Sequence, residues 1–381
     1  MRISAIKQLY KTHKEKVLFG RYITNEHIQP LLEKNQIDTS VEIIGYSVLN
    51  KPIYGLTLGK GSKRLLFWSQ MHGNESTTTK ALFDLLNTLL TPNKDLNHIL
   101  ESCTLYIIPI LNPDGATLYT RLNANEVDLN RDAQNLSQPE SRVLRAAFTQ
   151  FKPDFCFNLH GQRTIFSAGI SNKPATVSFL APAQDEACSV TENRKKAMEL
   201  ISVMNTALQE QIPDQIGVYD DAFNINCVGD TFQSYNVPTV LFEAGHYPND
   251  YHREVTRELI YAAYLTALDY ISKTDISGDH HQPYFKIPEN AKCFYDIIIR
   301  NALVNYKVTD VAVQYEERLV DDDIHFVPII EKMELLSNYY GHKEIDARGG
   351  AVLSAIGTTL ECSSENVFVM LNNEKISLLT Q

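Results

Sequence analysis

Seven runs rich in apolar and β-branched residues recur through the first two thirds of the chain. They lie at residues 41–48, 53–59, 64–70, 103–111, 154–160, 176–182 and 238–245. Most are almost continuously apolar, which is typical of strands that are buried on both faces of a parallel sheet. The segments between them often show a helical pattern. The order therefore predicts an α/β fold with a largely parallel sheet covered by helices on both faces.

Four longer segments have the periodicity of helices, at residues 76–90, 137–151, 191–212 and 250–273. The first begins at Ser76 and ends before Pro92. In the second, Ser137 and Glu140 match a capping box, and Pro139 falls in the first helical turn. These features predict where each helix begins.

The pattern changes near residue 274. Residues 274–283 are polar and contain glycine and proline, which is typical of a linker. The following residues alternate short β-like runs with turns. We therefore expect a larger α/β domain over residues 1–274 and a smaller β-rich C-terminal domain over residues 284–381.

Composition narrows the function classes. The net charge of −11, without a cluster of basic residues, argues against nucleic acid or an anionic membrane as a partner. The N-terminus lacks an apolar signal segment and no run of about 18 apolar residues occurs, so we expect a cytoplasmic protein. The six cysteines include no Cys-x-x-Cys pair, which predicts reduced thiols and no thiolate metal site.

Polar side chains gather where several predicted strands end. They are His72, Glu75, Asp128, Asn130, Arg131, His160 and Glu243. Ligands of open α/β sheets bind beyond the carboxyl ends of the strands. Two imidazoles and a carboxylate, with a fourth position left open, form the ligand set of a catalytic zinc site. One such residue alone could equally be a hydrogen-bonded loop residue, but the joint pattern favours a site.

The order of four short motifs resembles the M14 zinc carboxypeptidase family. The chain carries HGNE at 72–75, DLNRD at 128–132, LHG at 159–161 and LFEAG at 241–245. The similarity also includes the segments flanking HGNE and covers roughly residues 40–270. It implies an α/β sandwich of helices around a mixed, largely parallel central sheet.

The resemblance implies a role for each motif residue. His72, Glu75 and His160 would be the ligands of one zinc ion per chain. Asp128 would orient a ligand histidine from behind. Glu243 would be the general base that takes a proton from the zinc-bound water and later gives it to the leaving amine.

Further residues would bind the substrate. The resemblance makes Asn130 and Arg131 the pair that binds the substrate carboxylate, and Arg121 the residue that polarises the scissile carbonyl. Only eight residues separate Arg121 from Asn130. That short spacing is more similar to the murein-peptide amidases of the family, and partly to the aspartoacylase and succinylglutamate desuccinylase branch.

Two more positions have a matching place in the family. Tyr219 would cover the bound substrate, although it could also be an ordinary surface tyrosine. Asp230 would line the side-chain pocket and favour a cationic or amino-bearing group, although it could also cap a turn.

The resulting hypothesis is a zinc-dependent amide hydrolase, similar to metallocarboxypeptidases, that cleaves small peptides with a free carboxylate. One alternative is a deacylase of N-acyl amino acids, in which the β-rich C-terminal region would narrow the entrance. Another is a γ-D-glutamyl murein-peptide amidase. A non-catalytic binding module would not need Glu243. The physiological substrate, the oligomeric state and the role of the C-terminal region stay open at this point.

Overall fold

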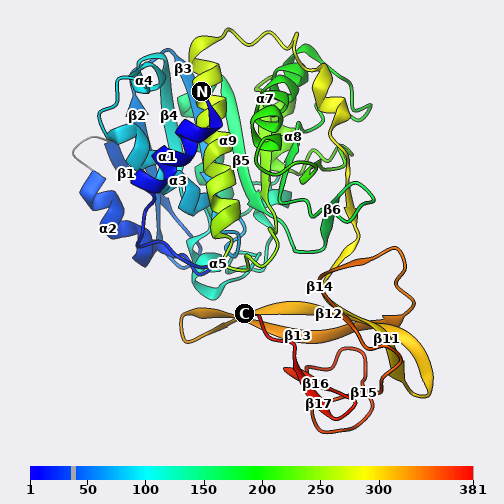
Figure 1. The fold of residues 1–381 in the computed structure, drawn as a ribbon. Helices are drawn as coiled ribbons and strands as arrows, with labels where there is room; N and C mark the ends of the chain where they lie inside the picture. The colour runs from blue at the N-terminus through cyan, green and yellow to red at the C-terminus, as the bar shows by residue number, and fades with distance from the viewer. Residues whose placement is uncertain (36–39, 381) are drawn as a thin grey trace.

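The computed structural model describes residues 1–35 and 40–380, and Figure 1 shows that they form two parts of unequal size. The larger part, which we call the α/β domain, has helices around a central sheet. The smaller part, which we call the β domain, comprises the strands from residue 294 to residue 377. The predicted α/β class and the β-rich C-terminal region are both confirmed.

The central sheet has eight strands in the order β1-β2-β4-β3-β5-β9-β7-β8. Its strands are β1 (Ser40–Tyr46), β2 (Pro52–Gly59), β3 (Lys63–Ser69), β4 (Cys103–Ile108), β5 (Phe155–Gly161), β7 (Val177–Leu180), β8 (Ile216–Val218) and β9 (Thr239–Ala244). The pairs β3–β4, β3–β5, β5–β9 and β7–β8 are parallel, whereas β1–β2, β2–β4 and β7–β9 are antiparallel. Each of the seven predicted apolar runs forms one of these strands, so the mixed, largely parallel sheet is confirmed.

Helices cover both faces of this sheet. One face carries α1 (Ile3–His13), α3 (Thr77–Leu90), α4 (Asn97–Ser102), α7 (Glu192–Gln209) and α9 (Glu254–Lys273). The other face carries α6 (Pro139–Phe151) and α8 (Val228–Ser234). The remaining described helices lie in connections; they are α2 (Asn25–Asn35), α5 (Pro113–Leu118), η1 (Leu129–Arg131) and η2 (Gln282–Lys286).

Strand β3 shows why the apolar runs are continuous. Leu65 and Phe67 belong to the core under α3, α7 and α9, whereas Leu66 and Trp68 belong to the core under α6 and α8. Successive side chains of a strand point to opposite faces, so a strand that is covered on both sides needs apolar residues throughout.

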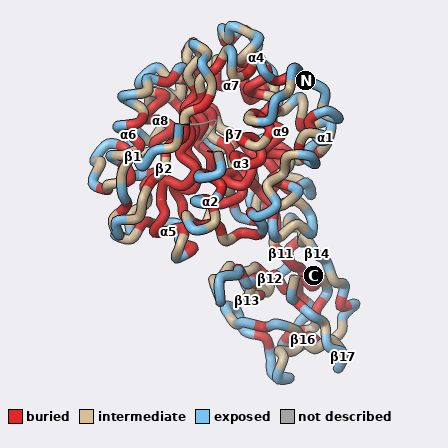
Figure 2. Tube along the Cα trace, turned by 90° about the vertical axis from the view of Figure 1, so that its left-hand side faces the viewer, coloured by how far each residue is buried: buried red, intermediate tan, exposed pale blue. Residues whose placement is uncertain are grey.

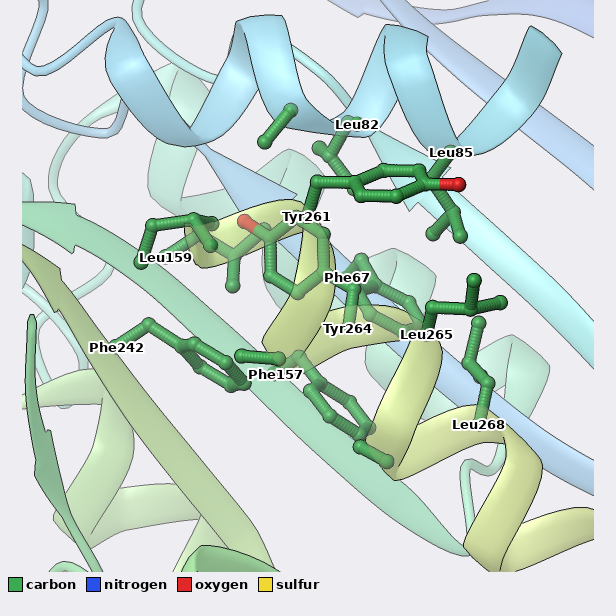
Figure 3. Packing of buried hydrophobic residues seen from close by; sticks show 14 of the residues in the cluster. Phe67, Leu82, Leu85, Phe157, Leu159, Phe242, Tyr261, Tyr264, Leu265 and Leu268 are labelled. Carbon is green, nitrogen blue, oxygen red and sulfur yellow. The ribbon is translucent and has the colours of Figure 1, made fainter. Parts of the chain in front are cut away.

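Aromatic packing spaces the three central strands β3, β5 and β9. Figure 3 shows Phe67, Phe157 and Phe242 of these strands beside Tyr264 of α9. The ring centroids of Phe67 and Phe157 are 4.3 Å apart, and those of Phe242 and Tyr264 are 5.3 Å apart. Because close-packed rings leave little room for shifts, this core fixes the positions of the strand ends.

A buried ion pair joins α3 and α9 on the same face. Arg257 donates from Nε and Nη2 to the two carboxylate oxygens of Asp84, both at 2.6 Å, and neither side chain is exposed. Arg257 also contacts Glu254, at 3.1 Å. Arg257 therefore binds one fully buried carboxylate, that of Asp84, and one partly exposed carboxylate, that of Glu254.

We expect Asp84→Asn to lower the free energy of unfolding by about 3 kcal/mol, because removing one partner leaves a buried charge without full compensation. Urea denaturation of the metal-free protein measures this change. The control is Glu192→Gln, which breaks an exposed pair with Lys195 and should cost less than about 1 kcal/mol. Similar losses in both variants would contradict a special role for the buried pair.

The β domain contains two sheets. The first has the order β13-β12-β11-β14, with β11 (Phe294–Val304), β12 (Lys307–Val320), β13 (Asp323–Glu334) and β14 (Tyr340–Asp346). The second consists of β15 (Val352–Leu353), β16 (Phe368–Leu371) and β17 (Glu374–Ser377). Figure 2 shows that buried residues fill the α/β domain, whereas the β domain has a small buried centre. A short pairing of β6 (Phe166–Ala168) with β10 (Asn290–Lys292) leads from one domain to the other.

The predicted capping box at Ser137 is wrong. Helix α6 begins at Pro139 with Gln138 at the N-cap, and no side chain caps it. Asp132 instead accepts hydrogen bonds from Ser137 N at 3.0 Å and from Gln138 N at 2.9 Å. Glu140 points inward and accepts a bond from Val48 N at 3.1 Å, so its carboxylate is not available for capping.

None of the described helices is long and apolar enough to cross a membrane.

Candidate active site

Three neighbouring parallel strands bring the predicted site residues to one edge of the sheet. His160 and Glu243 are in register on β5 and β9. His72 follows the end of β3, which pairs with β5 in parallel. Parallel strands end at the same edge, so residues that are distant in sequence meet there.

The loop after β3 is shaped to turn both His72 and Glu75 toward this edge. Gln70 has the positive φ of 43°, and its Nε2 donates to Gly73 O at 2.8 Å. Glu75 N donates to His72 O at 3.1 Å, which closes a turn. A Cβ atom on Gly73 would lie 2.0 Å from the backbone carbon of Gly115. The glycine between the two residues is therefore needed because another backbone passes close by.

The ligand atoms of His72, Glu75 and His160 converge within 4.8 Å of one another. His72 Nδ1 is 2.9 Å from Glu75 Oε1, and His160 Nδ1 is 3.0 Å from Glu75 Oε2. The two Nδ1 atoms are 3.2 Å apart. Both histidines are 2% exposed, so their Nδ1 atoms are shielded from bulk water.

This donor set fits zinc. Two histidine nitrogens and one carboxylate are the protein ligands of many catalytic zinc sites. Burial tends to raise the pKa of Glu75, but the neighbouring His72 and His160 outweigh it and lower that pKa, which keeps the carboxylate ionised. Burial lowers the pKa of His160, which favours the neutral imidazole that a metal requires.

Asp128 lies behind His72. Its Oδ1 is 3.0 Å from His72 Nε2, which assigns the proton to Nε2 and leaves Nδ1 free as a ligand atom. Asp128 also accepts bonds from Arg121 Nε at 3.1 Å and Nη2 at 3.0 Å. Burial tends to raise the pKa of Asp128, but His72 and Arg121 lower it. The carboxylate is thus held ionised by two partners.

Arg121 is half-exposed at the rim of the site, with 46% of its side chain accessible. Two of its nitrogens bind Asp128, and Nη1 is 3.5 Å from Glu75 Oε1. Among the described residues Nη1 makes only this long contact, so it is the nitrogen that can donate to a bound ligand.

Glu243 is partly exposed and faces the same space. Its Oε2 is buried and has no hydrogen-bond partner among the described residues. Burial, followed by the nearby charge of Glu75, raises the pKa of Glu243 well above its usual range. A carboxylate in this condition binds protons readily, which is what a general base requires.

Asn130 and Arg131 lie on η1, next to the N-terminus of α8. Asn130 Oδ1 accepts a bond from Val228 N at 3.0 Å, which reserves its amide nitrogen as a donor. Arg131 Nη1 donates to Asn130 O at 2.8 Å, and the guanidinium is exposed. Two adjacent donor groups are therefore available for an anion.

Tyr219 and Asp230 line the same cavity. Tyr219 OH donates to Gln162 Oε1 at 2.8 Å, and burial raises its pKa. Asp230 is 7% exposed, and burial raises its pKa to about 6. Its Oδ1 also accepts a bond from Asn224 N at 3.3 Å, so Asp230 both holds the loop and faces the cavity.

A single cavity of about 900 Å³ contains nine of the ten predicted residues. They are His72, Glu75, Arg121, Asn130, Arg131, His160, Tyr219, Asp230 and Glu243. Asp128 does not line the cavity, because it supports His72 from behind.

The sequence patterns missed other lining residues. Arg253, which is 2% exposed, donates to the carbonyl oxygens of Ala244 and Gln162, and so joins the ends of β9 and β5. The β domain also contributes, with Gln314 and Glu317 among its residues. No local motif marks any of these residues, because their role depends on segments that meet only in the folded chain.

Comparisons with known proteins agree with this geometry. The model of the zinc carboxypeptidase family, peptidase M14, matches residues 24–237. Probable carboxypeptidase 2 of Arthroderma benhamiae is 32% identical over 101 residues, which is 26% of this chain and 19% of that protein. Gamma-D-glutamyl-L-diamino acid endopeptidase 1 of Lysinibacillus sphaericus is 32% identical over 109 residues, which is 25% of this chain and 28% of that protein. The chain thus spans less than a third of the length of these two relatives.

A solved structure shares the fold. The putative carboxypeptidase A of Shewanella denitrificans OS-217 superposes with a TM-score of 0.54 at 20% identity, covering 65% of this chain and 69% of that one. The family model covers more than half of the chain and includes three of the four motifs. The protein therefore belongs to the zinc carboxypeptidase family, peptidase M14.

Proposed function

We propose that the protein is a zinc-dependent amide hydrolase that cleaves small peptides carrying a free carboxylate. The observation that supports this most is the convergence of a histidine, glutamate, histidine triad, a glutamate of raised pKa and an exposed arginine in one cavity. Each of these groups has a distinct part in amide hydrolysis.

In this proposal His72, Glu75 and His160 hold the metal. When bound, zinc would act as a Lewis acid that lowers the pKa of water toward about 7 and polarises the scissile carbonyl. Glu243 takes a proton from the attacking water and gives it to the leaving amine. Arg121 Nη1 donates to the carbonyl oxygen as negative charge develops there.

The proposed carboxylate site consists of Arg131 and Asn130. A planar guanidinium binds a carboxylate with two parallel bonds, and the Asn130 amide adds a neutral donor beside it. Asp230, close to Arg131 in the same cavity, would favour an amino group on the residue that carries the carboxylate.

The similarity to a gamma-D-glutamyl-L-diamino acid endopeptidase fits such an amino group, since a diamino acid has one on its side chain. The murein-peptide amidase hypothesis is therefore a second candidate. An N-acyl amino acid deacylase would use the same residues on a smaller substrate.

The test is purified, zinc-loaded protein with three matched substrate sets: peptides with free C-termini, γ-D-glutamyl peptides of a diamino acid, and N-acyl amino acids. We expect hydrolysis of at least one free-carboxylate set and little hydrolysis of the corresponding C-terminal amides. If none of the three sets is hydrolysed, the proposed function is wrong.

We expect Arg131→Ala to reduce kcat/KM for the free acid at least tenfold, because a charge-assisted hydrogen bond contributes about 1.5 to 3 kcal/mol. Hydrolysis of the C-terminal amide, already slow, should hardly change. Arg163→Ala is the matched control, because Arg163 is an exposed arginine that lines the same cavity. Equal losses on acid and amide would mean that Arg131 supports the structure and does not recognise the carboxylate.

A further inference from the structure

The cavity that contains the triad is closed on one side by the β domain. Its lining includes Asp296 of β11, Gln314 and Glu317 of β12, and Ile329 and Glu331 of β13. We call these five residues the β wall. Residues more than 120 positions after His160 in the sequence thus share one cavity with it. The following inference rests on the proposed function and concerns which substrates fit.

The β wall is attached to the α/β domain close to the triad. Gln314 Nε2 donates to Thr164 Oγ1 at 2.8 Å, and the ring of His342 on β14 bonds to Thr164 O, also at 2.8 Å. Thr164 follows His160 by four residues. Next to it, Phe294 N donates to Ile165 O at 3.1 Å. Both the side chains and the backbone of the β domain therefore bond to the segment that follows His160.

A second attachment lies on the other side of the wall. Arg21 of the α/β domain forms a two-bond ion pair with Glu317, at 3.0 and 3.1 Å, and Tyr119 OH also donates to Glu317. Arg21 is 8% exposed. Moving the wall away would leave this buried guanidinium without its carboxylate, which is costly.

Aromatic side chains fill the space between these attachments. Tyr251 of the α/β domain lies 5.1 Å, centroid to centroid, from the rings of both Tyr315 and Phe326. Its hydroxyl donates to Asp296 at 3.0 Å. The wall is therefore a packed interface, unlike a loosely hinged lid.

The proposed carboxylate site lies elsewhere around the triad. Arg131 donates to the backbone oxygen of Asn130, and the Asn130 side chain accepts a bond from Val228 N at the start of α8. The β domain instead bonds to the segment after His160 and to Arg21. Because different segments hold these two regions of one cavity, a substrate whose carboxylate binds Arg131 and whose scissile carbonyl lies at the triad would extend its acyl part toward the β wall.

We propose that the β wall limits the length of the acyl part, so that the enzyme acts on short peptides and small acyl amino acids and excludes longer chains. The cavity volume of about 900 Å³ falls within the range of sites for small ligands, about 300 to 1,000 Å³. Proteins and long peptides would have to displace both attachments before their scissile bond reached the triad.

The test is a series of substrates with the same C-terminal residue and an acyl part that grows from one residue to eight. With the full-length, zinc-loaded protein, we expect kcat/KM to fall by about tenfold or more between the short and the long members, as misfit at the acyl side reduces productive binding. Equal rates along the series would overturn the proposal, while leaving the proposed function intact. Absence of hydrolysis for every member would instead contradict the proposed function.

Variants of the wall make the test specific. Ile329→Ala should raise the ratio of long-substrate to short-substrate kcat/KM, and Ile329→Trp should lower it. Glu317→Gln, which weakens the attachment to Arg21, should raise the same ratio. The matched control is Glu334→Gln, which breaks an exposed pair with Lys332 on β13 and should leave the ratio unchanged. A general loss of structure lowers both rates together, so an unchanged ratio in the wall variants would overturn the proposal.

Discussion

Replacing His72 or His160 by alanine is expected to remove stoichiometric zinc and to lower hydrolysis by about a thousandfold or more. A catalytic metal contributes several kcal/mol to the transition state, and each 1.4 kcal/mol or so is a factor of ten in rate. Each variant leaves two ligands for an ion that requires three from the protein. Metal analysis of the purified variants, together with their activity, measures both effects.

The buried position of both histidines requires a separate check of folding. Circular dichroism and thermal unfolding of the metal-free proteins show whether each variant still has the wild-type fold. His280→Ala is the control for the substitution itself, because His280 is exposed in the connection between the domains. If both ligand variants retain the metal content of the wild type, the proposed ligand set is incorrect.

The α/β part of the fold was predictable because its signals are local. A strand such as β3, with one core above it and another below, needs an unbroken apolar run, and that run is visible in the sequence. The helix after it was also predictable from its period, and it begins one residue after Ser76, although the Ser76 hydroxyl donates to Arg21 O and does not cap the helix. The cap of α6 was not, because Asp132 binds the two residues that would otherwise begin the helix.

The candidate site was predictable to the extent that short motifs carry it. His72 and Glu75 are three residues apart and lie in one loop, so their spacing is visible without a structure. Glu317 illustrates the opposite case. Its partner Arg21 is 296 positions away, and in the sequence it belongs to an ordinary charged strand. Only the folded chain shows that the β domain completes the wall of the cavity.

Arg253 shows a second reason why part of the site could not be predicted from the sequence. It precedes α9 with a positive φ of 57°, and its guanidinium holds the carbonyl oxygens directly after Glu243 and two residues after His160. The pKa of Arg253 is lowered to about 10, first by burial and then by the nearby charge of Arg21, while Glu317 opposes both effects. The arrangement depends on charges from three distant segments, so no pattern along the chain could indicate it.

Glu243→Gln is expected to lower kcat by about a hundredfold or more while zinc and fold are retained, since general-base catalysis contributes about that much. Glutamine has the same shape but cannot take a proton from the attacking water. The pKa of Glu243 is raised by burial and by the charge of Glu75, so its ionised form carries an electrostatic cost in the folded protein. Removing that charge should leave the metal-free variant at least as stable as the wild type in urea denaturation at neutral pH.

A slow, stable and zinc-loaded variant would identify Glu243 as the base. A rate near that of the wild type would assign the base to another group, and loss of zinc would mean that Glu243 contributes to metal binding instead.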